Sequence, residues 1–545
     1  MVAKFVMYQP EPQSVTFSML INDIDKGIIK IPQFQRDFVW SLEQSAKLID
    51  SIIKGYPIGT FILWESDEVL RSVRNIGGAN LPDTPSGSMV QYVLDGQQRM
   101  TSLYASLKGL KISRDNTVED FSQIYIDLIA NEDNSVTLTN VDERNQLEVI
   151  SLKDLINGGL SVLASYPREL HKKLEDYKER LTTYRFSTIL MRGASIDVAT
   201  EVFTRLNVGG KSLTVFEIMV AKTYDATLDF DLSEKYDDII EKLEQVGYET
   251  ISASTVLQSI SILLVGECAR KNILKLDKSS LISMWPKAID AIEKAVEYFR
   301  NYYRIPVSKI LPYNALIVPF SYFFYHHPIK PVNEMKLYLD DFFWRTSLTD
   351  RYSSGVETKL SQDIKRIDLI LKNQLPKYDV QVDTSKEMII NNGWFSANRS
   401  FIKAILCLMA YKEPKSFNDN SIVRINNDWL KQANSRNYHH FFPRAYLKKQ
   451  GEDEFYINHI VNITIVDDFL NKNIIRAKAP SVYMAPFKKQ NKDLVQTMKT
   501  HLIGDLSEYG VWNDDYEAFF DKRAETISQE LEKRIIPQKL GVKQP

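Results

Sequence analysis

The chain has 545 residues and almost balances 68 Lys and Arg against 70 Asp and Glu, which gives a formal net charge of −2 at pH 7. This length exceeds what one hydrophobic core usually supports and therefore predicts two to four domains. The balanced charge excludes a uniformly basic nucleic-acid binder, so any surface for nucleic acid must be local.

The content of cysteine and of apolar residues indicates a cytoplasmic protein. The two cysteines, Cys268 and Cys407, lie far apart in apolar segments, as expected for buried thiols in a reducing compartment. No apolar run approaches the roughly 20 residues of a membrane span. We therefore expect a soluble, cytoplasmic chain.

Three short motifs follow one another in the N-terminal region: IPQFQRDFVW (31–40), GYPIG (55–59) and DGQQRMTSL (95–103). Ser41 with Gln44 predicts a capping box that opens a helix ending near Gly55. Apolar runs predict strands at 61–64 and 90–94, and further strands are expected at 124–128 and 186–191.

The turn at Asp95 and Gly96 comes between a strand and a helix, which is the geometry of an anion site. Gly96 permits the turn, the first helical N–H groups are available to an anion, and Arg99 offers a fork for phosphate oxygens. On these residues alone, a capped helix whose Arg99 pairs with Asp95 is the competing interpretation.

Together the three motifs resemble the ParB/sulfiredoxin-like N-terminal domain of GmrSD-type restriction proteins, which phosphorothioation-sensing defence proteins share. The resemblance implies a nucleotide-binding NTPase domain over residues 1–225, with Asp95 and Arg99 as catalytic residues. It implies nucleotide contacts from Gln35, Arg36, Asp95, Gly96, Gln97, Gln98 and Arg99.

A second segment, FTRLNVGGKSLT (203–214), matches the same family and follows an expected helix at 198–206. It adds Arg205, Asn207 and Lys211 as secondary nucleotide-site candidates. Its two glycines suit a phosphate nest and a plain helix C-cap equally well. From 226 to 385 the apolar periodicity is helical. We interpret this stretch as a coupling and dimerisation layer, with a plain helical scaffold as the alternative.

The C-terminal region, residues 386–545, contains adjacent histidines followed by two phenylalanines and Pro443. If Tyr438 to Phe442 form a strand, His439 and His440 lie on opposite faces. Asn462 opens a short alternating run, and Asn471 follows nine positions later at the start of an expected helix. A helix-end pair bonded to backbone carbonyls is the alternative for the two histidines.

This segment resembles the HNH (ββα-metal) nucleases found at the C-terminus of GmrSD-type proteins. The resemblance implies that His440 is the general base, that His439 is a metal ligand, and that Asn462 orients the loop or the base. Asn471 is implied as the second ligand of Mg²⁺ or Mn²⁺, with Asn473 as its rival. His459 has no counterpart in the family pattern, so we expect it at the surface or in a supporting position.

Basic residues gather beside this motif. Six Lys or Arg and no acidic residue occur between Asn471 and Lys492, which suits a DNA backbone, although a charge run is also typical of a solvated face. The predicted DNA contacts are Lys448, Lys449, Lys472, Arg476 and Lys478.

The expected fold is α+β and multidomain, with an α/β N-terminal domain, a helical middle and a ββα-metal nuclease domain in a mostly helical surround. The expected function is a nucleotide-regulated, metal-dependent DNA endonuclease of a modification-dependent restriction or phage-defence system. The alternatives are a nucleotide-gated DNA-binding regulator that does not cut, and an RNA-cleaving toxin. The expected partners are DNA, a nucleoside triphosphate and a second copy of the chain.

Overall fold

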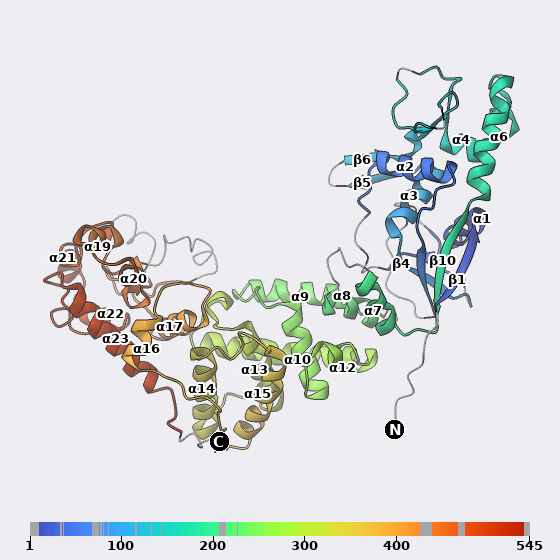
Figure 1. Ribbon diagram of the computed structural model, residues 1–545. Helices are drawn as coiled ribbons and strands as arrows, with labels where there is room; N and C mark the ends of the chain where they lie inside the picture. Colours follow the sequence, from blue (N-terminus) through green and yellow to red (C-terminus); the bar gives the residue numbers. More distant parts are fainter. Residues whose placement is uncertain are drawn as a thin grey trace, which may run out of the picture. The chain divides into compact units, whose positions relative to one another are not determined.

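The computed structural model describes most of the chain and divides it into two compact units, Met1–Asp231 and Leu232–Pro545 (Figure 1). The described residues are all except 1–9, 33–34, 36–37, 68–75, 77–78, 80, 86, 115–116, 132, 143, 207–213, 226, 426–438, 467–474 and 539–545. Within the described part, no helix has the length and apolarity needed to cross a membrane.

The N-terminal unit is built on a mixed five-stranded sheet with the order β1-β10-β3-β4-β2. Its strands are β1 (Glu11–Thr16), β2 (Ile29–Lys30), β3 (Phe61–Ser66), β4 (Val90–Asp95) and β10 (Arg185–Arg192). β3 pairs antiparallel with β4 and parallel with β10. The apolar runs at 61–64 and 90–94 are thus confirmed as neighbouring strands, and both lie inside the sheet rather than at its edge.

Helices complete the core of this unit. They include α1 (Phe17–Asp25), α2 (Leu42–Ile53), α3 (Gln97–Lys108), α6 (Arg168–Thr183), α7 (Ile196–Leu206) and α8 (Val215–Thr223). The predicted capping box is present at α2, where the side chains of Ser41 and Gln44 each accept a bond from the other's backbone N–H. A small sheet of β7 (Tyr125–Asp127), β8 (Thr137–Leu138) and β9 (Val149–Ser151) lies between α3 and α6 in the sequence.

The first part of the C-terminal unit is helical, as its periodicity predicts. Its main helices are α9 (Leu232–Glu244), α10 (Ala253–Val265), α12 (Lys278–Asn301), α13 (Ile317–His326), α14 (Asn333–Leu348) and α15 (Val356–Leu371). Aromatic rings join α12, α13 and α14, with Phe299 and Phe320 at 4.6 Å and Tyr303 and Phe343 at 4.1 Å between ring centroids. Both cysteines are free and buried, as expected.

The remainder of this unit surrounds one short strand pair, β11 (His439–His440) with β12 (Ile463–Thr464). The helices around it are α16 (Lys386–Asn392), α17 (Ser400–Tyr411), α19 (Arg444–Gln450), α20 (Glu454–Ile457), α21 (Pro480–Gln490), α22 (Leu494–Lys499) and α23 (Tyr516–Glu532). The strand expected to continue through Phe442 ends at His440. The strand ends early because the Phe442 N–H donates to the Asn462 side chain rather than to the backbone of a neighbouring strand.

Candidate active site

The adjacent histidines lie on β11 and pair antiparallel with β12, with His439 opposite Thr464 and His440 opposite Ile463. The Thr464 hydroxyl lies 3.3 Å from the His439 carbonyl oxygen, to which it donates, and 2.9 Å from His439 Nδ1. In the tautomer whose Nδ1–H donates to this hydroxyl, the second ring nitrogen of His439, Nε2, is the unprotonated one.

His439 Nε2 is buried and has no hydrogen-bond partner in the described part of the chain. The side chain is 1% exposed and faces the rings of Phe417 and Tyr483, each with its centroid 6.2 Å away. Burial, with the neighbouring His440, His501 and Arg523, lowers the pKa of His439 well below its usual 6.5. The imidazole is thus neutral, which is the form that binds a metal.

His440 is held by a residue that the sequence motifs do not identify. Its Nε2 lies 3.1 Å from Asn458 Oδ1, and the Asn458 amide in turn donates to the Phe395 carbonyl at 3.4 Å. Since the amide oxygen accepts, Nε2 of His440 carries the proton and Nδ1 is the basic nitrogen. The polar Asn458–His459 step, four residues before Asn462, is the only sequence signal for this contact.

Asn462 holds the backbone of the loop that follows the histidines. It is fully buried; its Oδ1 accepts from the Phe442 N–H at 2.9 Å, and its Nδ2 donates to the carbonyls of Phe442 and Ile457 at 3.0 and 3.1 Å. The backbone geometry of this loop thus depends on one amide. This arrangement is what loop orientation by Asn462 requires, while a role in catalysis stays a prediction.

His459 is not a surface residue, so that part of the expectation is wrong. It is 0% exposed, its Nε2 lies 3.0 Å from the Ile390 carbonyl, and its Nδ1 accepts from the Val461 N–H. Burial lowers the pKa of His459 to about 4. Both ring nitrogens thus bind backbone groups, so the buried imidazole has its hydrogen bonds made.

Arg523 on α23 binds the backbone beside the same loop. It is fully buried and donates to the Val461 carbonyl and, from two nitrogens at 3.2 and 3.0 Å, to the His501 carbonyl. Three donors on backbone oxygens fix the closing helix to the turn before Asn462. Burial lowers the pKa of Arg523 to about 9.

A metal ion would need ligands beyond His439. Within the described ranges, no group of three or more His, Cys, Asp or Glu side chains could hold a metal. Asn471, Asn473 and Lys472 lie outside the described residues. The buried Nε2 of His439, without a partner among the described residues, fits a metal ligand. A hydroxyl beside Nδ1 suits a ligating histidine, whose other ring nitrogen usually donates to a neighbouring group.

The predicted DNA contacts differ in how free their charges are. Lys448 pairs with Glu454 at 3.0 Å, and Glu454 also pairs with Arg444. Lys449, Arg476 and Lys478 are exposed. The Lys448 charge is therefore partly neutralised, so this basic surface depends more on the other three residues.

In the N-terminal unit, the DGQQR turn joins β4 to α3. Gly96 has a φ of 93°, and a Cβ there would lie 2.5 Å from the Phe61 ring. Arg99 donates to the carbonyls of Ile58 at 2.7 Å and Thr60 at 3.1 Å, and to Asp95 at 3.1 Å. The Arg99–Asp95 pair of the competing interpretation is thus present, and the same guanidinium joins the GYPIG turn to DGQQR.

The glutamines of the motifs also bind backbone groups. Gln35 Nε2 donates to the Val93 and Leu94 carbonyls at 2.7 and 2.9 Å. Gln98 accepts from the Val39 N–H at 2.8 Å and donates to Gln97. These contacts bring the first and third motifs together, as one shared pocket would require. Their roles toward a nucleotide stay predictions.

The remaining nucleotide-site candidates are not brought to this turn by the described contacts. Arg205 is exposed on α7 and pairs with Glu201 on the same helix at 2.8 Å. Arg36, Asn207 and Lys211 lie outside the described residues.

Comparison with known proteins supports the N-terminal resemblance. Residues 17–224 match the model of the GmrSD restriction endonuclease N-terminal domain. Over a 597-residue alignment, the chain is 23% identical to the uncharacterized protein MJ0686 of Methanocaldococcus jannaschii, covering 96% of this chain and 97% of that one. Strands β2, β3, β4 and β10 and the DGQQR turn fall inside the matched range, whereas β1 precedes it. This part of the chain is thus similar to a domain found in restriction endonucleases.

Proposed function

We propose that the protein is a metal-dependent DNA endonuclease of a modification-dependent restriction or phage-defence system, regulated by a nucleotide bound in its N-terminal unit. The observation that carries the proposal is the set of contacts around β11. Asn462 binds the loop backbone, Asn458 orients His440, and His439 keeps a buried ring nitrogen that has no partner among the described residues. The family match at residues 17–224 supports a nuclease of this kind.

In the proposed reaction, a water molecule attacks the scissile phosphorus while His440 takes its proton on Nδ1, and the bond to the 3′ oxygen breaks. An imidazole suits this step because its charge changes near neutral pH. His439 and Asn471, or Asn473 in its place, would hold Mg²⁺ or Mn²⁺. When bound, the ion supplies charge neutralisation at the phosphate and the leaving oxygen.

The reaction also requires that His440 becomes accessible. The side chain is 8% exposed, which leaves little room for a phosphodiester. The proposal therefore includes a rearrangement around His440 when DNA or nucleotide binds.

At the nucleotide site, we assign Asp95 and the first-turn amides of α3 to the phosphates and their metal. The Asp95 side chain is 43% exposed although it pairs with Arg99, so it can still reach a ligand. The described hydrogen bonds of Arg99 go to Ile58, Thr60 and Asp95. To bind the γ-phosphate, Arg99 would therefore have to release one of these three acceptors.

A nucleotide-gated DNA-binding regulator that no longer cuts is an alternative from a different class of function. An RNA-cleaving toxin is the remaining alternative, because a basic surface does not distinguish the two polymers.

The deciding experiment measures cleavage of unmodified plasmid, phage DNA with glucosylated bases, phosphorothioated DNA and RNA. Each is incubated with Mg²⁺ or Mn²⁺, with and without mixed nucleoside triphosphates. Wild type is compared with His440→Ala and with His326→Ala, which removes an exposed histidine from the end of α13.

We expect one DNA substrate to be cut by wild type and His326→Ala. The rate should fall by about 10²–10⁴-fold in His440→Ala, because a general base contributes that much. Equal cutting by His440→Ala would remove the assigned base. No cutting of any polymer, with nucleotide still hydrolysed, would favour the regulator.

A further inference from the structure

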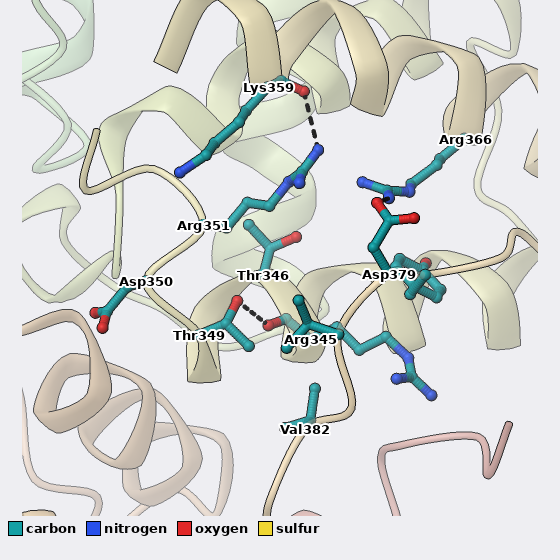
Figure 2. A pocket seen from close by; sticks show the side chains of 11 residues that line it. Arg345, Thr346, Thr349, Asp350, Arg351, Lys359, Arg366, Asp379 and Val382 are labelled. Carbon is teal, nitrogen blue, oxygen red and sulfur yellow. Dashed lines mark hydrogen bonds and ion pairs between the residues drawn. The ribbon is translucent and has the colours of Figure 1, made fainter. Parts of the chain in front are cut away.

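A pocket of about 310 Å³ lies between α14 and α15, away from the strand pair that carries the histidines. Figure 2 shows its lining from α14, the turn after it, α15 and the segment that follows α15. The lining combines four cations with two threonines and one tyrosine. These residues are Arg345, Arg351, Lys359, Arg366, Thr346, Thr349 and Tyr378.

The arginines are fixed in place by two fully buried carboxylates. Asp341 receives two bonds from Arg345 Nε at 2.9 and 2.8 Å. Asp363 accepts from Arg351 at 3.0 and 2.9 Å and also from Arg366. Since both carboxylates are 0% exposed, the guanidinium groups are ordered before any ligand arrives.

The pocket is not distinguished by net charge. Asp350 and Asp379 also line it, and Asp379 pairs with Arg366 at 3.0 Å (Figure 2). Four carboxylates therefore balance the four cations. An ion-pair network that only stabilises the fold would also have balanced charges, but its N–H donors would be bonded to acceptors of the protein.

Several donors of the lining are not used in the described part of the chain. Nη1 of Arg345, Nη1 of Arg351 and Nζ of Lys359 have no acceptor there, whereas the other nitrogens of the two arginines are bonded. The Tyr378 hydroxyl is buried without a partner, and its ring lies 4.7 Å from the Arg345 guanidinium carbon.

We propose that this pocket binds a phosphate-bearing ligand, either inorganic phosphate or polyphosphate or the phosphate groups of a nucleotide. Arginine forks and a lysine ammonium with free N–H groups are the donors that phosphate oxygens prefer. The oxygens of a phosphate could accept from these groups together. Of the described lining donors, the buried Tyr378 hydroxyl is the one that is costly to leave without a hydrogen bond. The volume falls in the range of small-molecule sites and exceeds the size of one phosphate.

This site is separate from the proposed nucleotide site at Asp95, which lies in the other unit, so the two are tested separately. The experiment is isothermal titration calorimetry of the full-length chain with orthophosphate, pyrophosphate and ATP at constant NaCl. The variants are Lys359→Gln, which removes the unpaired cation, and Thr346→Val, which removes a buried hydroxyl at the same volume. Lys365→Gln is the matched control, because Lys365 is exposed on the same helix and does not line the pocket.

We expect wild type and Lys365→Gln to bind pyrophosphate alike. Lys359→Gln should weaken that binding by about 10-fold or more, and Thr346→Val by about 3-fold, as expected for the loss of a charge-assisted and of a neutral hydrogen bond. If pyrophosphate and ATP bind equally tightly, the phosphates are the recognised part; a tighter binding of ATP that Lys359→Gln also weakens identifies a nucleotide.

Two results would overturn the proposal. One is that no probe binds, or that pyrophosphate binds with the same affinity in Lys359→Gln, Thr346→Val and wild type. The other is that ATP alone binds and neither variant changes its affinity, because that result assigns all binding to another site. Circular dichroism of each variant confirms that it is folded before its affinity is compared.

Discussion

The DGQQR turn of the N-terminal unit and the histidine strand of the C-terminal unit use their polar groups differently. Arg99 donates to two backbone carbonyls and a carboxylate, and Gln35 and Gln98 also bind backbone groups. His439, in contrast, keeps a buried nitrogen that binds nothing in the described residues.

This difference separates what holds a fold together from what is available to a ligand. A buried polar group with a hydrogen-bond partner stabilises the protein, whereas one without a partner costs free energy and is available to a ligand. The DGQQR residues therefore have a demonstrable structural role in addition to any role in nucleotide binding. His439 has spare binding capacity that the fold alone does not explain.

Among single substitutions, the largest effect on stability is expected from Arg99→Ala. The substitution leaves the carbonyls of Ile58 and Thr60 without their donor and removes the pair with Asp95. We expect a loss of about 3 kcal/mol in the stability of the N-terminal unit, since bonds to charged groups contribute about 1.5–3 kcal/mol each. Nucleotide hydrolysis should fall as well.

Urea unfolding followed by hydrogen exchange distinguishes the two units and measures this loss. Protection should fall in β3, β4 and α3 and stay unchanged around β11, since Arg99 has no described contact outside its own unit. If Arg99→Ala were as stable as wild type but hydrolysed no nucleotide, Arg99 would act on the nucleotide alone. The contrast between the DGQQR turn and the histidine strand would then be wrong.

Acid should destabilise the C-terminal unit first. Four of the seven histidines are buried, His439, His440, His459 and His501, and all four lie in this unit. Burial lowers the pKa of His459 and His501 to about 4, below the 6.5 expected when unfolded. The unfolded chain thus binds more protons between pH 6.5 and 4, and stability falls as the pH falls through this window.

At pH 5 the loss relative to pH 8 should be about 2 kcal/mol for each of these two histidines. The measurement is the free energy of unfolding against pH for wild type and His501→Gln, which keeps a donor for the Lys415 carbonyl. The variant should show a shallower pH dependence, and His326→Gln, at an exposed position, should match wild type. Parallel curves for all three proteins would show that His501 does not titrate as a buried group.

A smaller effect is expected from Asn458, which acts on the reaction through His440. Asn458→Ala should slow cleavage by about 10-fold, or about 1.4 kcal/mol in the barrier, because the imidazole loses the partner that fixes its orientation and tautomer. Asn458→Asp keeps an acceptor oxygen and adds a charge that raises the pKa of the imidazole. Its pH–rate profile should therefore shift to higher pH while much of the activity returns. If neither variant changed the pH–rate profile, Asn458 would have only a structural role.

The sequence predicts the elements well where local patterns decide them. Ser41 with Gln44 forms the expected capping box, and the apolar runs at 61–64 and 90–94 become β3 and β4. Each of these signals depends on residues within a few positions of one another, so it can be read without knowing the fold.

The contacts that build the candidate sites could not be read in this way. Asn458 reaches His440 across 18 positions, and Arg523 reaches Val461 across 62. His459 is buried, and its Nε2 lies 3.0 Å from the carbonyl oxygen of Ile390, 69 positions away. Such pairings arise from tertiary packing, which a motif does not encode.

His439 gives the smallest expected change in stability and the sharpest contrast with Arg99. In His439→Leu the orphaned nitrogen disappears, and the Thr464 hydroxyl keeps its bond to the backbone carbonyl of residue 439. The lost Nδ1 bond and the removed desolvation cost oppose each other, so the free energy of unfolding should change by less than about 1 kcal/mol. Mn²⁺ binding, measured by calorimetry, and DNA cleavage should both be lost, because His439 is the one described ligand. A loss of stability like that of Arg99→Ala, with Mn²⁺ binding intact, would instead make His439 a core residue, and the metal would have to be held by other side chains.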